Sequence, residues 1–386
     1  MYFLRSITTS ALCFLGIFLI LLKDVSSWSN GPNLAVTNRG FEKKTLESDP
    51  ATALQEYIDR AGATRYCEIG TTKYGRGLVA TKNLEPGETV LSIPLKETII
   101  VEQSESEPSV PISDSWAGQL ANELIKRQSQ AISDDNNAVA IYSRALPPPP
   151  PTPSRGDWSI KALETLGDID IRRGIEAAQE WRNDQWEMFG VANGALGDQQ
   201  RFLDALDLVS SRTIRCGSKF MLVPFLDMAN YASRNQGGGY YKLTEGSSGS
   251  SDGIIELKIG DRGCRVGDEI FLDYGDRTNE EWLIYYGFLP DRNSAESLVL
   301  PVSQRTITWD NVAGEDEGLK EECRAVLDNS STSLADDIIE LKKLESGDRD
   351  ADVTMVLALK YRIAQKTLLT AVAGVKTSSA FTSVFL

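Results

Sequence analysis

Two groups of short extended runs, separated by a helical middle third, restrict the fold of this 386-residue chain more than any other feature. Residues 65–101 and 221–288 both alternate short apolar runs with glycine and proline turns, which is typical of short β-strands. Between them, at about 105–210, apolar residues recur at helical spacing. The pattern predicts an α+β fold in which small sheets are interrupted by a helical insert.

The individual elements follow from the same periodicities. We expect helices at 54–61, 116–125, 202–209, 279–286, 334–344 and 353–368, and strands at 67–69, 77–80, 89–93, 222–226, 253–259 and 269–274. The proline block at 147–153 predicts a stiff surface linker in the polyproline II conformation. The residues from about 291 to the end are expected to form a helical C-terminal domain.

The chain contains no histidine, which restricts its chemistry. Ser-His-Asp triads, Cys-His pairs, histidine-ligated zinc and an imidazole general base are all excluded. Proton transfer must therefore depend on Asp, Glu, Tyr, Lys, Cys or water. The 40 Lys and Arg against 55 Asp and Glu give a net charge of −15, which argues against binding to a nucleic-acid backbone.

The cysteines show no metal-binding spacing. None of the five stands in a C-x-x-C pair, so we expect no structural zinc site and no other metal. Two disulfides are compatible with the count, but we interpret the residues mostly as buried free thiols. The five are Cys13, Cys67, Cys216, Cys264 and Cys323.

The N-terminus has the layout of a targeting segment. Residues 1–27 contain one cation, a 12-residue apolar run at 11–22 and small residues before Trp28, as in a signal peptide. Residues 28–50 form a transit-like or linker segment. The combination resembles the bipartite plastid leaders of algae with secondary plastids, so we expect a plastid address. The alternatives are the secretory pathway and an uncleaved membrane anchor.

Three motifs recur in one order along the chain. The first is Lys73-Tyr74-Gly75-Arg76-Gly77-Leu78-Val79-Ala80, the second Leu222–Tyr231 (LVPFLDMANY), and the third Gly267–Gly275 (GDEIFLDYG) with Asn279-Glu280-Glu281 and Tyr285–Pro290 (YYGFLP) after it. Each alone is compatible with an ordinary turn, or with a strand leading into a turn or helix. No helix is expected after the first motif, which argues against a dinucleotide-binding fingerprint.

Together the motifs resemble the SET-domain protein methyltransferases, in particular the class of Rubisco large-subunit lysine methyltransferase. That class has a G-x-G-L turn, a helical insert, a P-x-x-D-x-x-N-H block, an E-I-F-x-x-Y-G strand and an N-x-E helix ending in Y-G-F. The resemblance extends over about residues 51–370. It implies a SET domain at 51–290, with the insert at about 105–210, and a helical substrate-binding domain at 291–386.

The resemblance also implies a function, namely methyl transfer from S-adenosylmethionine to a lysine side chain of a protein substrate. Tyr274 falls on the family's catalytic tyrosine. Arg212 matches an arginine near the carboxylate of the cofactor. The other positions carried over as cofactor-binding are Tyr74, Gly75, Arg76, Asp227, Met228, Ala229, Asn230, Tyr231, Tyr286, Gly287 and Phe288. We expect a monomer whose partner is a protein of unknown identity, with no nucleic acid and no membrane contact beyond the leader.

This chemistry does not need histidine. Methyl transfer to an amine is an in-line displacement, so the protein supplies alignment and a dry channel. Water can take the proton of the amine, and a neutral tyrosine hydroxyl can orient the amine and the polarised methyl group. One position departs from the family, because Tyr231 stands where the family usually has histidine. An inert SET-like binding module therefore stays open as an alternative. A histidine methyltransferase also stays open, because the class can methylate histidine as well and the sequence does not distinguish the two acceptors.

Overall fold

The computed structural model describes residues 49–103, 115–130, 138–167, 169–191, 198–246, 253–291, 293–346 and 352–374. The predicted signal peptide, with Cys13, and positions 28–48 of the transit-like segment lie outside the described residues, as do parts of the helical insert and residues 375–386. Within the described residues, no helix has the length and apolar character that crossing a membrane requires.

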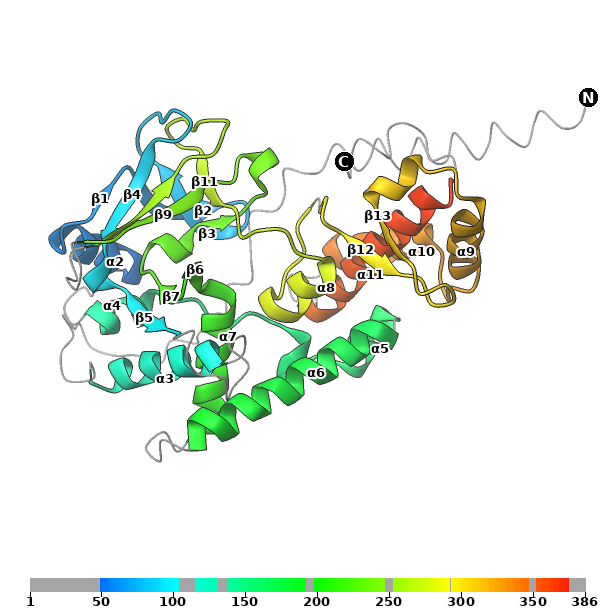
Figure 1. Cartoon of the computed structure of the whole chain (residues 1–386), viewed down its shortest axis with the longest axis horizontal. Coiled ribbons are helices and arrows are strands. Elements are labelled where there is room, and N and C mark those ends of the chain that lie inside the picture. The colour runs from blue at the N-terminus through cyan, green and yellow to red at the C-terminus, as the bar shows by residue number, and fades with distance from the viewer. Residues whose placement is uncertain are drawn as a thin grey trace, which may run out of the picture.

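Four small sheets confirm the predicted α+β class (Figure 1). Their strand orders are β1-β4-β10-β9, β2-β3-β11-β8, β5-β7-β6 and β12-β13. The bounds are β1 Thr64–Arg65, β2 Cys67–Thr72, β3 Gly75–Ala80, β4 Thr89–Pro94, β5 Ile99–Glu102, β6 Ile214–Cys216, β7 Lys219–Leu222, β8 Asn230–Tyr231, β9 Tyr240–Thr244, β10 Ile254–Lys258, β11 Glu269–Leu272, β12 Ser297–Val299 and β13 Thr306–Thr308.

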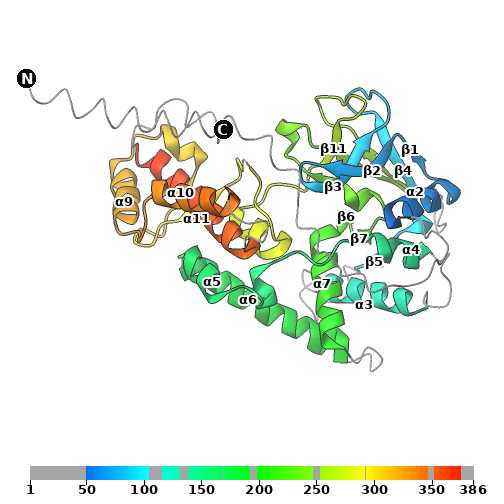
Figure 2. The ribbon, with the colours of Figure 1, turned by 180° about the vertical axis from the view of Figure 1, so that it is seen from behind.

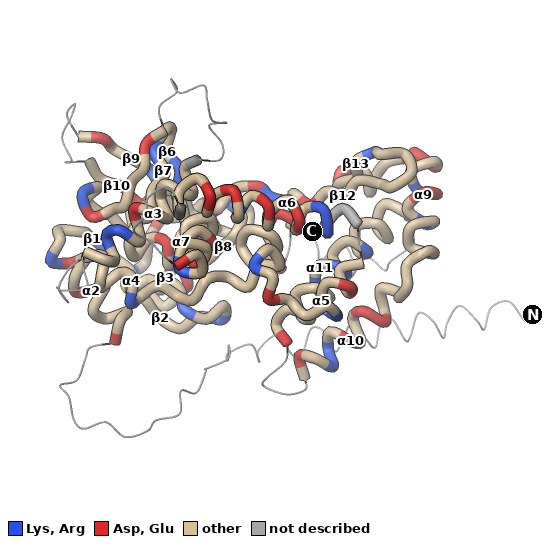
Figure 3. Tube along the Cα trace, turned by 90° about the horizontal axis from the view of Figure 1, so that it is seen from below, with Lys and Arg blue, Asp and Glu red and all other residues tan. Residues whose placement is uncertain are grey.

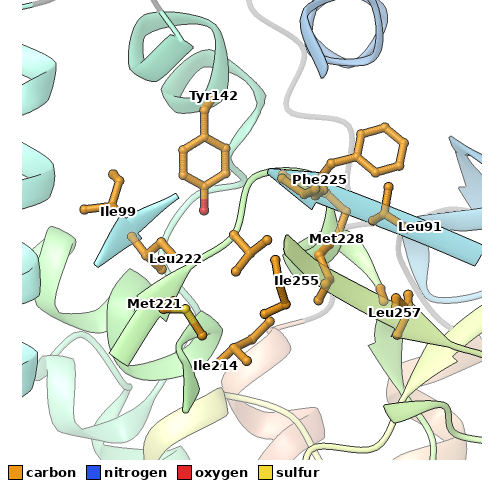
Figure 4. Close-up of a cluster of buried hydrophobic side chains, with 14 of the residues drawn as sticks. Leu91, Ile99, Tyr142, Ile214, Met221, Leu222, Phe225, Met228, Ile255 and Leu257 are labelled. Atoms are coloured by element: carbon orange, nitrogen blue, oxygen red, sulfur yellow. The ribbon is translucent and has the colours of Figure 1, made fainter. Parts of the chain in front are cut away.

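The first three sheets share one hydrophobic core, because alternate strand residues point inward. In the antiparallel pair β4–β10, Leu91 lies opposite Leu257 and Ile93 opposite Ile255, and all four are fully buried. Figure 4 shows Leu91, Ile255 and Leu257 beside Met228 in this core. The alternation of buried and exposed positions explains why short strands form here.

Helices of the insert cover one side of these sheets (Figure 1). The helix α2 (Pro50–Arg60) precedes the sheets, and the insert contains α3 Ser115–Gln130, α4 Ala138–Ala145, α5 Ile160–Leu166, α6 Ile169–Gln185, which continues into the π-helical turn η5 Trp186–Val191, and α7 Gln199–Arg212. Helix α3 buries Leu120, Leu124 and Ile125 at helical spacing against the sheet core. The insert is therefore a packed part of the domain.

A helical region follows the last strand of the sheet core. It contains α8 Asn279–Glu281, the π-helical turn η8 Trp282–Tyr286, the 3₁₀ turn η9 Trp309–Ala313, α9 Glu317–Asp328, α10 Leu334–Ser346 and α11 Val353–Val372. Figure 2 shows α5 and α6 of the insert lying along α11. Trp158, Leu166 and Ile175 of the insert region share a buried cluster with Met355 and Tyr361 of α11. Acidic and basic residues are interspersed along the described trace (Figure 3).

The proline block is more than a surface linker. Thr152 and Pro153 are buried, and the indole Nε1 of Trp158 donates to the carbonyl of Pro151 at 3.0 Å. A Cβ added to Gly287 would lie 3.0 Å from Pro151, so the block packs directly against the segment that follows η8. The composition predicted a stiff segment, but it did not predict what that segment contacts.

Candidate active site

The glycine turn of the first motif joins β2 to β3 in an antiparallel hairpin. Gly75 has φ of +94°, a conformation that a residue with a side chain rarely adopts. Gly77 is required for a different reason, since a Cβ there would lie 2.8 Å from both Asn230 Nδ2 and Glu269 Oε1. The turn therefore brings backbone directly against side chains from β8 and β11.

The second motif contains a strained turn where a strand was predicted. Strand β7 ends at Leu222, and the chain then turns at Phe225, which has φ of 77° and ψ of −47°. Such a conformation costs about 1–3 kcal/mol for a residue other than glycine, and it occurs mainly at functional sites. The expected strand at 222–226 was wrong, because the 3₁₀ turn η6 (Leu226–Met228) follows at once and leads into Asn230.

Strand β11 connects the three motifs. It pairs antiparallel with β3, where Glu269 lies opposite Val79, and parallel with β8, where Phe271 lies opposite Asn230. Asn230 Nδ2 donates to the carbonyl of Arg76 at 3.1 Å and to Glu269 Oε1 at 2.8 Å. Residues separated by up to 193 positions in the sequence thus meet at one place, as the resemblance implies.

Tyr274 lies just after β11 and points back toward the second motif. Its hydroxyl donates to the carbonyl of Ala229 at 2.6 Å. Burial raises the pKa of the phenol well above its usual value, so the group stays neutral near pH 7. With its proton committed to Ala229, the oxygen still has lone pairs that can accept weak contacts from a reacting group.

Two arginines and one buried aspartate form a charged cluster beside this tyrosine. Arg212, the last residue of α7, donates to the carbonyl of Asp227 at 2.7 Å and lies 3.5 Å from its carboxylate. Tyr142 of α4 donates to the same carboxylate at 2.5 Å. Burial lowers the pKa of Arg76, and the neighbouring Arg212 adds to the effect. Arg76 has no ion-pair partner among the described residues, so the cluster favours an added anion.

A cluster of aromatic side chains packs around Tyr274. Tyr231 lies against Trp282, with ring centroids 4.5 Å apart, and against Tyr274 at 5.5 Å. Trp282 also contacts Tyr286 at 4.8 Å and Phe288 at 5.1 Å. Sequence analysis missed Trp282, because an apolar helical pattern gives no sign of which residue faces the site. Its indole N–H is buried and has no partner among the described residues.

Some of the predicted site residues lie at the rim or in the core. Tyr74 is 48% exposed at the hairpin tip, where its hydroxyl donates to Asp291 at 3.2 Å. The side chain of Met228 is packed in the sheet core (Figure 4), so only its backbone can face a ligand. Tyr274 lies close to the second motif, at Asp227, Ala229, Asn230 and Tyr231. Gly287 adopts a left-handed backbone conformation at the end of η8. The described residues contain no cluster that could hold a metal ion.

The start of α8 orients this aromatic cluster through a buried polar network. Glu296, which is 3% exposed, accepts from the backbone N–H of Asn279 at 2.6 Å. Asn293 donates to the side chain of Asn279 and to the carbonyl of Arg277, both at 2.9 Å. These bonds fix the first turn of the helix that carries Trp282.

This network predicts a pH dependence. Burial, with Glu280 nearby, raises the pKa of Glu296 to about 7, so its stabilising contribution is complete below the unfolded-state pKa and is lost as the pH rises through 7. Glu296→Gln has nearly the shape of the protonated carboxyl group and stays uncharged at every pH. We expect the variant to gain about 3 kcal/mol in free energy of unfolding over the wild type between pH 4.5 and 8. Denaturant unfolding at a series of pH values measures the difference, and two parallel pH curves would contradict the prediction.

Comparison with known proteins identifies solved structures that share the fold of this chain. No family model and no curated protein sequence matches the chain. Among solved structures, the SET domain of LSMT bound to lysine and AdoHcy superposes with a TM-score of 0.62 at 15% identity, covering 86% of this chain and 91% of that one. Rubisco LSMT bound to AdoMet gives 0.60 at 15% identity, covering 85% and 92%.

The chain therefore has the SET-domain fold. A third structure, Rubisco LSMT bound to sinefungin and monomethyllysine, gives a TM-score of 0.59 at 15% identity, covering 85% of this chain and 92% of that one. A match over 85% of the chain cannot be reached if the sheet core, the insert or the helical C-terminal region is left out. The similarity therefore extends over all three. The resemblance of the three motifs and the similarity of the whole fold thus agree.

Proposed function

We propose that the protein transfers a methyl group from S-adenosylmethionine to a lysine side chain of another protein. The observation that carries the proposal is the convergence of the Tyr274 hydroxyl, the Asn230 amide and the Arg76–Arg212 pair at one place. Solved structures with the same fold are described with AdoMet, AdoHcy or sinefungin bound, and two of them with lysine or monomethyllysine. These ligands belong to those proteins, and they support the proposal for this one.

The residues present suit such a cofactor. Arg212 and Arg76 provide positive charge for its carboxylate, since among the described residues Asp227 is the only acidic side chain that forms an ion pair with either of them. Asn230 offers an amide beside them. The cofactor supplies an electrophilic methyl group on a sulfonium. Tyr274, held by Ala229, can orient the incoming amine, and the ring of Tyr231 beside it gives the hydroxyl an apolar neighbour that disfavours water.

The proposal is tested by following labelled methyl groups. Protein incubated with S-adenosylmethionine labelled in the methyl carbon, together with candidate acceptor proteins, should transfer label to lysine, and mass spectrometry identifies the modified residue. Label on histidine would favour the histidine methyltransferase. Binding of an acceptor protein without any transfer would favour an inert binding module. The plastid address and the monomeric state remain predictions from the sequence.

Tyr231→His tests the position that departs from the family. The backbone of Tyr231 is held by pairing with Leu272, whereas its ring packs on Trp282 and Tyr274. We expect the variant to lose about 1–2 kcal/mol of stability while its cofactor Kd changes less than about threefold. Thermal unfolding and titration measure the two effects. A change in Kd of tenfold or more would show that the tyrosine ring itself forms part of the cofactor site.

A further inference from the structure

The carboxylate of Glu269 lies between the glycine turn and Asn230, and the family motifs assign it no role. It belongs to β11, next to the hairpin, and its Oε1 lies 2.8 Å from Asn230 Nδ2. A Cβ on Gly77 would lie 2.8 Å from each of these two atoms. The contact is therefore part of a closely packed unit.

The hydrogen bonds determine which way the Asn230 amide faces. An amide nitrogen has two N–H donors, and here one donates to the carbonyl of Arg76 and the other to Glu269. The reverse orientation would place the amide oxygen against two acceptors, which is unfavourable. No hydrogen bond to Oδ1 is present in the described part of the chain, so this oxygen is the atom left to accept from a ligand.

Glu269 is itself held in place by the hairpin. Thr72, in the same hairpin, is a neighbour that lowers the pKa of this carboxyl against the larger opposing effect of burial, and the backbone N–H of Tyr74 donates to the Thr72 hydroxyl at 3.2 Å. A Cβ on Gly77 would meet Thr72, Glu269 and Asn230 within 2.9 Å, so the hairpin and these side chains pack as one unit. This close packing limits how far the carboxylate can move away from Asn230.

We propose that Glu269 is a positioning residue, which holds Asn230 Oδ1 so that it accepts a hydrogen bond from the α-ammonium group of the cofactor. This inference rests on the proposed function. An exposed acceptor selects a donor on the ligand, and the α-ammonium is attached to the same carbon as the carboxylate that Arg212 and Arg76 are suited to bind. Asn230 donates to the carbonyl of Arg76, so its amide lies beside a residue whose guanidinium would hold the carboxylate of the cofactor.

The test combines a protein change with a ligand change. S-adenosylhomocysteine and its analogue without the α-amino group are titrated into the full-length wild type, Glu269→Met and Glu269→Gln. Methionine has a similar length but accepts no comparable hydrogen bond, whereas glutamine retains an acceptor oxygen. In the wild type we expect loss of the amino group to raise Kd at least about tenfold. In Glu269→Met the ratio should fall to about threefold or less, and Glu269→Gln should recover most of it.

A matched control separates positioning from a general structural effect. Glu256 is a part-buried carboxylate on β10 that bonds to Thr89 and Lys258, so Glu256→Met makes the same chemical change away from the site. It should leave the ratio of the two Kd values as in the wild type. An unchanged ratio in Glu269→Met, or equal weakening of both ligands, would overturn the inference.

Two further outcomes are distinguishable. If Glu269→Met instead altered the preference between adenosyl and inosyl ligands, Oδ1 would face the adenine amine, which contradicts the assignment to the α-ammonium. Absence of binding of either ligand by the folded wild type would contradict the proposed function, and the inference with it. Thermal unfolding without ligand establishes that each variant is folded.

Discussion

Tyr274→Phe should reduce the turnover of methyl transfer by at least about 100-fold while changing the Kd of the cofactor less than about threefold. The substitution keeps the ring, and with it the contacts to Tyr231 and Tyr286. It removes the oxygen that donates to Ala229 and that would orient the amine during transfer. A loss of alignment acts on the transition state more than on cofactor binding, so the effect should appear in kcat.

Single-turnover transfer and calorimetric titration measure the two quantities for Tyr274→Phe. Tyr240→Phe is the matched control, because Tyr240 lies on β9 in another sheet and is 37% exposed. The control should transfer at the wild-type rate. If Tyr274→Phe did so as well, the role assigned to this hydroxyl would be wrong.

Asp337→Asn should be the most destabilising conservative change in the helical C-terminal region, costing about 3–5 kcal/mol. The Asp337 side chain is 1% exposed and accepts from Arg362 at 2.6 Å and from Lys366 at 2.7 Å. Burial alone would raise the pKa of this carboxyl, but the bonds from Lys366, Arg362 and Thr332 outweigh it and hold the pKa below the usual value. Neutralising the group leaves two cations without their buried partner.

The effect should reach the insert, because Arg362 also donates to the carbonyl of Thr165 at 3.0 Å, next to the end of α5. Denaturant unfolding measures the loss of stability. Asp336→Asn is the control, since the neighbouring Asp336 is exposed and bonds only to Ser333 among the described residues. A similar loss in both variants would show that the buried charge cluster is not what holds α10 and α11 together.

The sequence predicted the strands and helices where local periodicity determines them. The runs at 67–69, 77–80 and 89–93 lie within β2, β3 and β4, and the stripes at 334–344 and 353–368 lie within α10 and α11. The strand expected at 222–226 failed, because strand propensity there gave way to a turn that requires φ of 77° at Phe225. A phenylalanine at this position gives no sign of a positive φ, which glycine would have indicated.

The motifs predicted the residues of the site better than the contacts among them. Asn230 and Tyr274 are brought together by the pairing of β11 with β8, and Arg212 joins them by bonding to Asp227, neither of which periodicity alone determines. Trp282 and Tyr142 were not among the predicted site residues, since an apolar or aromatic residue on a helix indicates burial without indicating its partner. The sequence predicted Glu269 only as a residue of a strand motif. The positioning role proposed for it depends on the bond to Asn230, which the sequence did not predict.

Calorimetric titration of the purified protein with S-adenosylmethionine is the most direct test of the central claim that this SET fold binds the cofactor at the Arg212–Asn230–Tyr274 site. We predict saturable binding to one site with Kd in the micromolar range, and marked weakening in Arg212→Met, which removes one of the two cations proposed to hold the carboxylate of the cofactor. Absence of binding at millimolar cofactor, by protein that unfolds cooperatively, would contradict the account.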